Sequence, residues 1–112
     1  MAYKSQLYTC GSWFVKPGME QSFIEAWQAF ADWTSRAQPG AGSGILLQAE
    51  DDSQKFISFG PWDTAEHITD WRSKQEFQDF IAKARELCQE MKPQTMKVVG
   101  HSGPNVSREP GS

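Results

Sequence analysis

The sequence predicts an α+β domain of the ferredoxin-like, split βαβ type, with a four-stranded antiparallel sheet and all helices on one of its faces. Two observations lead to this prediction. The spacing of apolar residues switches between a two-residue and a helical period in the order strand, helix, strand, strand, helices, strand. The chain has 112 residues, which suits a single domain.

The first half of the chain contains three expected strands and one helix. Apolar side chains alternate over residues 6–15, as in a strand covered on both faces. From residue 19 to about residue 37 they recur every three or four positions, as in an amphipathic helix. Pro and Gly within residues 38–42 end that helix. Strands over residues 44–50 and 55–62 flank a short turn, which predicts an antiparallel hairpin.

The second half contains two expected helices and a last strand. Residues 63–66, Asp-Thr-Ala-Glu, fit a capping box that opens a short helix. Residues 73–76, Ser-Lys-Gln-Glu, fit a second capping box and open a longer helix. We expect this helix to end at Lys92-Pro93 and the last strand to span residues 95–101.

Composition narrows the class of protein. With 38% hydrophobic and 22% charged residues, the chain is expected to be globular, neither disordered nor membrane-embedded. A net charge of −3 without a Lys/Arg cluster argues against a nucleic-acid partner. The N-terminus lacks an apolar signal core, so we expect a cytoplasmic protein. The domain is expected over residues 1–102, followed by a flexible tail rich in Gly, Pro and Ser over residues 103–112.

The predicted topology leaves one sheet face without cover, because all helices lie on the other face. That face would carry Tyr8, Phe14 and some of Ile45, Leu47, Ile57, Phe59 and Val99. An apolar sheet face needs a cover, and a second copy of the chain supplies one in an isologous contact. We therefore expect a homodimer formed through the sheet face.

The aromatic content is unusually high, with five Trp and seven Phe. A small core cannot easily hide so many rings, so some are expected either to line a cavity or to meet a second subunit. Small strand residues such as Ser58 can open space for a ligand in such a cavity. The residues that we expect to bind the substrate are Trp13, Phe23, Trp27, Phe30, Ser58, Trp62, Trp71, Phe77 and Ile81.

Several short motifs occur in a characteristic order: Phe14 to Gly18 after the first strand, Ala37 to Gly40 after the first helix, Phe56 to Trp62, Trp71 to Ser73, and Phe77. In their order and spacing they resemble the antibiotic biosynthesis monooxygenase family of dimeric α/β-barrel proteins. The resemblance covers most of the chain. It implies the ferredoxin-like fold and a dimer. Some members oxidise polycyclic phenols or quinols with O₂ and without metal or flavin, some degrade haem, and many have no known role.

The haem-degrading branch of that family uses an Asn in the first strand, a Trp at the end of the short helix and an iron-ligating His in the last helix. Matching the shared motifs puts these positions at Gly11, Trp71 and Ile81. Gly has no side chain to donate a hydrogen bond, and Ile cannot bind iron. The resemblance therefore implies metal-free chemistry, with no cofactor and no metal ligands.

The leading hypothesis is a cofactor-independent monooxygenase for a small aromatic, quinol-type compound, with Trp71, His101 and His67 as candidate catalytic residues. Arg72 and Arg85 are candidates to hold an anionic substrate. One alternative is a non-catalytic domain that binds a small hydrophobic molecule or serves in a stress response, since no compelling acid–base residue stands out. A weaker one is haem binding through His67 or His101.

Overall fold

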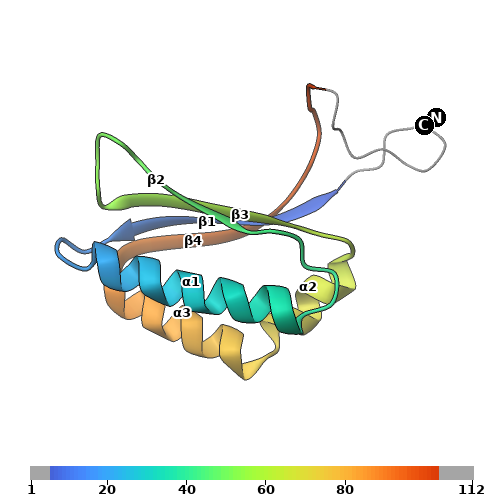
Figure 1. Cartoon of the computed structure of the whole chain (residues 1–112), viewed down its shortest axis with the longest axis horizontal. Coiled ribbons are helices and arrows are strands. Elements are labelled where there is room, and N and C mark those ends of the chain that lie inside the picture. Colours follow the sequence, from blue (N-terminus) through green and yellow to red (C-terminus); the bar gives the residue numbers. More distant parts are fainter. Residues whose placement is uncertain (1–5, 104–112) are drawn as a thin grey trace.

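The computed structural model describes residues 6–103 (Figure 1). The predicted tail beyond Gly103 lies outside the described residues. The elements follow the expected order: β1 (Leu7–Val15), α1 (Glu20–Ala37), β2 (Ile45–Gln48), β3 (Lys55–Trp62), α2 (Ala65–Arg72), α3 (Gln75–Leu87) and β4 (Cys88–Lys97). No helix in this part of the chain is both long enough and apolar enough to cross a membrane.

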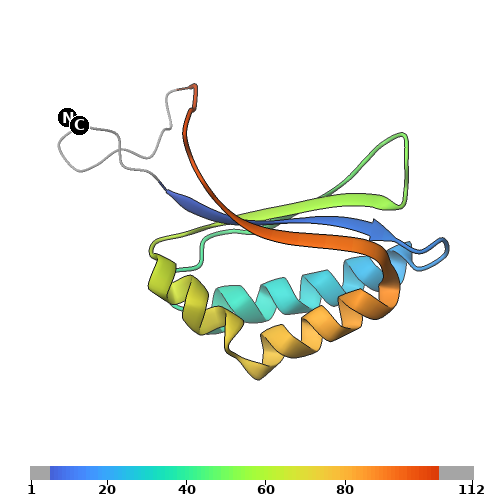
Figure 2. The ribbon, with the colours of Figure 1, turned by 180° about the vertical axis from the view of Figure 1, so that it is seen from behind.

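The four strands form one antiparallel sheet in the order β2-β3-β1-β4. Helices α1, α2 and α3 all lie against the same face of this sheet (Figure 1), and the view from behind shows the opposite face without cover (Figure 2). The predicted ferredoxin-like fold is therefore confirmed. β3 has its expected bounds, whereas β2 is shorter than the expected residues 44–50.

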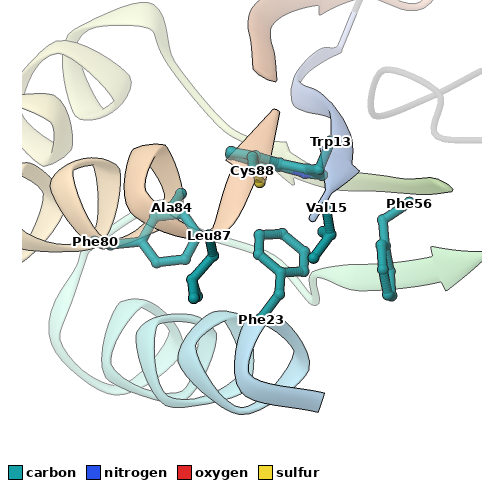
Figure 3. Close-up of a cluster of buried hydrophobic side chains, with 8 residues drawn as sticks. All are labelled: Trp13, Val15, Phe23, Phe56, Phe80, Ala84, Leu87 and Cys88. Carbon is teal, nitrogen blue, oxygen red and sulfur yellow. The ribbon is translucent and has the colours of Figure 1, made fainter. Parts of the chain in front are cut away.

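The main core lies between the sheet and the two long helices (Figure 3). Phe23 of α1 is fully buried, and its ring lies 5.2 Å from that of Phe56 in β3. Phe80, Ala84 and Leu87 are buried at helical spacing along α3, which gives this helix one apolar face. Burying one large apolar side chain contributes roughly 1.5–3 kcal/mol, so this cluster holds the helices against the sheet.

The C-terminal part of the domain differs from the expectation. α3 ends at Leu87 and β4 begins at Cys88, so the expected helix end at Lys92-Pro93 and the strand over residues 95–101 are wrong. Pro93 lies inside β4, opposite Gly11. β4 is an edge strand, and an edge strand tolerates Pro where the missing N–H would face away from the sheet.

Cys88, the first residue of β4, is buried in the core. Burial raises the pKa of the Cys88 thiol to about 11, so this thiol is neutral.

The two expected capping boxes are also wrong in detail. Thr64, not Asp63, is the N-cap of α2, and its hydroxyl accepts a hydrogen bond of 3.1 Å from the backbone N–H of His67. Lys74 is the N-cap of α3 and makes no side-chain capping bond. Ser73 instead ends α2, where its hydroxyl donates to the carbonyl of Asp70.

The uncovered sheet face carries large apolar side chains, as expected. Ile45, Leu47 and Ile57 are 46%, 52% and 46% exposed. The ring of Tyr8 lies 6.3 Å from that of Phe59 on the same face. In the single chain these side chains form an apolar surface across β2, β3 and β1.

Two glycines with the same backbone conformation allow a prediction about stability. Gly18 and Gly40 have φ angles of 85° and 86°. A Cβ on Gly18 would meet no atom within 4 Å, whereas a Cβ on Gly40 would meet the side chains of Asp63 and His67. We expect Gly18→Ala to lower the free energy of unfolding by about 1 kcal/mol through backbone strain alone. Gly40→Ala should cost about 2–3 kcal/mol, because a hydrogen-bonded side-chain pair must also move.

Urea-induced unfolding of the two variants measures this difference. Because both substitutions impose the same φ strain, Gly18→Ala is the matched control for Gly40→Ala. Equal losses of stability would show that the Asp63 and His67 side chains do not hold the loop after α1 in place.

Candidate functional site

A cavity of about 100 Å³ lies between the sheet and the helices and is partly open to solvent. Its floor comes from β1, β3 and the segment before β2, and its walls come from all three helices. An apolar cavity of about 150 Å³ can hold benzene, so this cavity is on the scale of a single aromatic ring. Larger ligands would extend through the open side.

The cavity exists because the sheet has small residues at its centre. Thr9 lies opposite Gly60, and Gly11 lies opposite Ser58, in the pairing of β1 with β3. These positions share the helix-facing side of the sheet, because side chains alternate along each strand. Gly44, just before β2, continues this small-residue surface next to Gly60. Around Thr9, Gly60 and Gly44 the sheet therefore leaves space below the helices.

Large residues border this floor at both ends. Trp13 pairs with Phe56 at one end, and Leu7 pairs with Trp62 at the other. The Trp13 ring lies directly over Gly11, where an added Cβ would come within 2.5 Å of the indole. Along the two strands, two pairs of small residues thus lie between two pairs of large residues, and the cavity has aromatic ends.

The walls are stacked aromatic rings. Phe30 of α1 stacks on Phe80 of α3, with ring centroids 4.4 Å apart and parallel planes. Trp71 at the end of α2 contacts Phe30, Trp62 and Phe77, with centroid distances of 5.5, 4.9 and 4.8 Å. A ring held on several sides has little freedom to move, so Trp71 is a rigid wall of the cavity.

Three indole groups make hydrogen bonds to hydroxyl groups that line the cavity. The Nε1 atom of Trp13 donates to Oγ of Ser58, at 3.0 Å. Trp62 donates to Oγ1 of Thr9, also at 3.0 Å. In the third pair, Nε1 of Trp71 donates to Oγ1 of Thr34 in α1, at 3.0 Å.

Arg72 places a positive charge at the edge of the cavity. Its Nη2 atom donates a 2.7 Å hydrogen bond to Oγ1 of Thr95 in β4. Within residues 6–103, no carboxylate forms an ion pair with Arg72. The same side chain also lines a neighbouring open groove, together with Arg85 of α3. Arg72 is therefore available to a negatively charged group in the cavity.

The two histidines lie away from the cavity lining. His67 shares a 2.6 Å hydrogen bond with Asp63, and this bond lowers the pKa of the Asp63 carboxyl. His101 follows β4 and is exposed. Neither residue lines the cavity. The described part of the chain contains no group of three or more His, Cys, Asp or Glu side chains placed to hold a metal ion.

The structure brings together most of the side chains that the sequence suggested for substrate binding. Phe23 is the exception, because it lies in the closed core near Phe56 and does not line the cavity. It precedes Trp27 and Phe30 along α1, so it reaches a different part of the sheet. The suggested residues that line the cavity are Trp13, Trp27, Phe30, Ser58, Trp62, Trp71, Phe77 and Ile81.

Sequence reasoning missed the hydroxyl groups of Thr9 and Thr34. The alternation of small residues at Thr9 and Gly11, repeated at Ser58 and Gly60, is visible in the sequence. It becomes meaningful only when the register sets the two pairs side by side. Thr34 becomes recognisable only when Trp71 is known to point at it.

Residues 10–83 match the family model described as antibiotic biosynthesis monooxygenase. The chain belongs to this family. The matched segment contains most of β1, both residues of the Trp71-Arg72 pair and most of α3, and thus most of the cavity. The family assignment agrees with the resemblance found in the sequence motifs. A search among curated proteins gives no significant sequence match.

Solved structures support the antibiotic biosynthesis monooxygenase fold. SnoaB, a cofactor-independent oxygenase from Streptomyces nogalater, is similar with a TM-score of 0.78 and 16% identity over 86% of this chain and 95% of that chain. A putative antibiotic biosynthesis monooxygenase from Nitrosomonas europaea gives 0.77 and 18%, over 92% and 100%. A Shewanella oneidensis protein gives 0.77 and 18%, over 87% and 97%. At these identities the likeness concerns the fold.

Proposed function

We propose that the protein is a cofactor-independent monooxygenase that acts on a small aromatic phenol or quinol. The observation that carries the proposal is the cavity itself, with stacked aromatic walls and one cationic side chain, Arg72, at its edge. Membership of the antibiotic biosynthesis monooxygenase family supports the reaction class. The fold of SnoaB, a cofactor-independent oxygenase, is consistent with this proposal.

The chemistry asks little of the protein, because an electron-rich phenolate can transfer an electron to O₂ directly. For an anthrone, the overall change converts a ring CH₂ and O₂ into C=O and H₂O. For a hydroquinone, a ring C–H becomes C–OH while the hydroquinone becomes a quinone, and the second oxygen atom again leaves as H₂O. In both cases the substrate supplies all the electrons. Arg72 would stabilise both the phenolate and the negative charge that develops on oxygen. The aromatic walls would exclude water and hold the ring in place.

The cavity lining contains no carboxylate and no imidazole among the described residues. The proton of the bound phenol therefore leaves to solvent and not to a side chain of the lining. A cation within about 4–6 Å of a phenol lowers the phenol pKa. Catalysis would thus follow the ionisation of the bound substrate, with Arg72 lowering the pH at which the reaction becomes fast.

Oxygen uptake by protein freed of metals with a chelator tests the proposal. With anthrone-type phenols or naphthohydroquinones as substrates, we expect equimolar consumption of O₂ and substrate. Trp71→Ala should lower kcat/KM at least about tenfold, because one wall is lost. Arg72→Gln should move the pH profile to higher pH, because the phenolate is no longer favoured.

Arg85→Gln is the matched control, because Arg85 lines the neighbouring groove but not the cavity. It should leave the pH profile unchanged. The proposal fails if uptake by the wild-type protein does not exceed that of Trp71→Ala across the substrate panel.

The second candidate function is non-catalytic binding of a small hydrophobic molecule. The lack of an acid–base side chain among the cavity-lining residues favours it. Saturable binding of an aromatic ligand without oxygen uptake would support this second function.

We further propose that two copies of the chain associate through the uncovered sheet face. Ile45, Leu47 and Ile57 are about half exposed on that face, next to Tyr8 and Phe59. An isologous contact would bury this surface on both copies at once. The helices and the cavity would remain on the outside of such a dimer.

A further inference from the structure

The hydroxyl groups of Thr9, Thr34 and Ser58 each use a lone pair to accept an indole N–H. A hydroxyl also carries one proton to donate and a second lone pair. Within residues 6–103, none of these three hydroxyl protons has a protein acceptor. All three hydroxyls line the cavity.

Thr69 in α2 is a helical Thr whose hydroxyl does not accept a hydrogen bond from an indole. Its hydroxyl donates to the backbone carbonyl of Ala65, one turn earlier, at 3.1 Å. Thr34 occupies a comparable position inside α1 but makes no such bond, and its oxygen accepts from Trp71 instead. The indole therefore turns the hydroxyl away from its own helix and leaves its proton free.

Because an accepted hydrogen bond polarises a hydroxyl, each of these groups becomes a better donor. Ser58 is buried, and Thr9 and Thr34 are half-buried. A buried donor without an acceptor is unfavourable, so a ligand that supplies an acceptor gains affinity, most of all at Ser58. Ser58 and Thr9 stand on diagonal positions of the floor, on the order of 7 Å apart. Two oxygens of one ligand could therefore each meet one hydroxyl.

We propose that the cavity selects aromatic ligands by their oxygen acceptors, with the hydroxyls of Ser58 and Thr9 in the floor and Thr34 in the wall as donors. The ligand class is then a ring ketone, quinone or phenolate rather than a plain hydrocarbon. The inference rests on the proposed function, since it concerns the substrate of the same cavity. It assigns the tryptophans a positioning role, because their N–H groups orient the hydroxyls and do not contact the ligand.

Binding of a matched pair of ligands tests this selectivity without any turnover. 1-Tetralone and tetralin have the same rings and differ in one carbonyl oxygen. By equilibrium dialysis or calorimetry we expect the wild-type protein to bind 1-tetralone about tenfold more tightly. Ser58→Ala, Thr9→Val and Thr34→Val should reduce this preference, and a combined variant should abolish it. Affinity for tetralin should stay within about threefold.

Thr69→Val is the control, because it removes a hydroxyl that bonds to its own helix outside the cavity lining. It should keep the full preference. Trp71→Phe tests the positioning role, because it keeps the Thr34 hydroxyl but removes the indole that turns it away from its own helix. This variant should lose the part of the preference that Thr34 contributes, as Thr34→Val does, and should keep the part that Ser58 and Thr9 contribute.

An equal affinity of the wild-type protein for the two ligands would overturn the inference. So would a preference that survives in the combined hydroxyl variant. The proposed oxidation is judged separately, because a protein that prefers the ketone but consumes no O₂ would retain the selectivity and lose the monooxygenase function. A protein that consumes O₂ but shows no hydroxyl-dependent selectivity would retain the monooxygenase function and lose the proposed selectivity.

Discussion

Ala31→Phe is expected to reduce binding and turnover of an aromatic substrate by at least about a hundredfold while the protein stays folded. Ala31 lies on α1 between Trp27 and Thr34, at helical spacing, and lines the cavity with them. A benzyl side chain at this position occupies space of about one aromatic ring, which is the space that the cavity offers. The substitution removes no hydrogen bond of the protein.

The expected cost in stability is modest, because the new ring enters an existing space. Overpacking a core typically costs about 1–3 kcal/mol, and part of this is offset by burial of the new ring. Calorimetric titration and oxygen uptake measure the functional loss, and urea unfolding measures stability. Ala37→Phe is the matched control, since Ala37 ends the same helix and is exposed. Full activity in Ala31→Phe would mean that the substrate binds elsewhere.

Ile57→Glu is expected to convert a dimer into monomers, with a rise in the dimer dissociation constant of at least about a hundredfold. Ile57 is 46% exposed and lies on β3, between Leu47 of β2 and Ser12 of β1. In an isologous contact the substitution buries a carboxylate on each copy against an apolar surface. Burying an unpaired charge costs several kcal/mol, so association should fail.

Sedimentation equilibrium of the purified variants measures this dissociation constant. Met19→Glu is the matched control, because Met19 is 41% exposed but precedes α1, away from the uncovered sheet face. It should sediment as the wild-type protein does. A wild-type protein that is monomeric at high concentration would contradict the proposed association.

The fold class could be predicted because most elements carry one clear period. Phe23, Trp27 and Phe30 repeat at helical spacing in α1, and Phe56 and Ser58 alternate with exposed residues in β3. Such patterns reflect burial of one helix or strand face, and they depend only on neighbours in the chain. The order of the elements then left few possible topologies.

The boundary between α3 and β4 could not be predicted in the same way. Leu87, Cys88 and Met91 fit a helical period, although only Leu87 belongs to the helix. Pro93 is a strong helix breaker, so the local sequence predicts that the helix ends there. Its place in β4 depends on the edge position of that strand, which is a property of the whole sheet.

The candidate site was predictable only in part, for a related reason. An excess of Trp and Phe indicates aromatic walls, and most of these residues do line the cavity. The donors that give the cavity its polarity depend on contacts between distant segments, such as Trp62 with Thr9 and Trp71 with Thr34. No local pattern encodes such contacts, so they appear only in the folded chain.

The most direct test of the proposed monooxygenase reaction is a single-turnover reaction under ¹⁸O₂ with chelator-treated protein and an anthrone-type phenol, followed by mass spectrometry of the product. We expect one ¹⁸O atom in the new carbonyl group, formed by the wild-type protein and by Ala37→Phe but not by Ala31→Phe. Product that carries oxygen from water, or labelled product formed equally by Ala31→Phe, would contradict oxidation of the substrate by O₂ within this cavity.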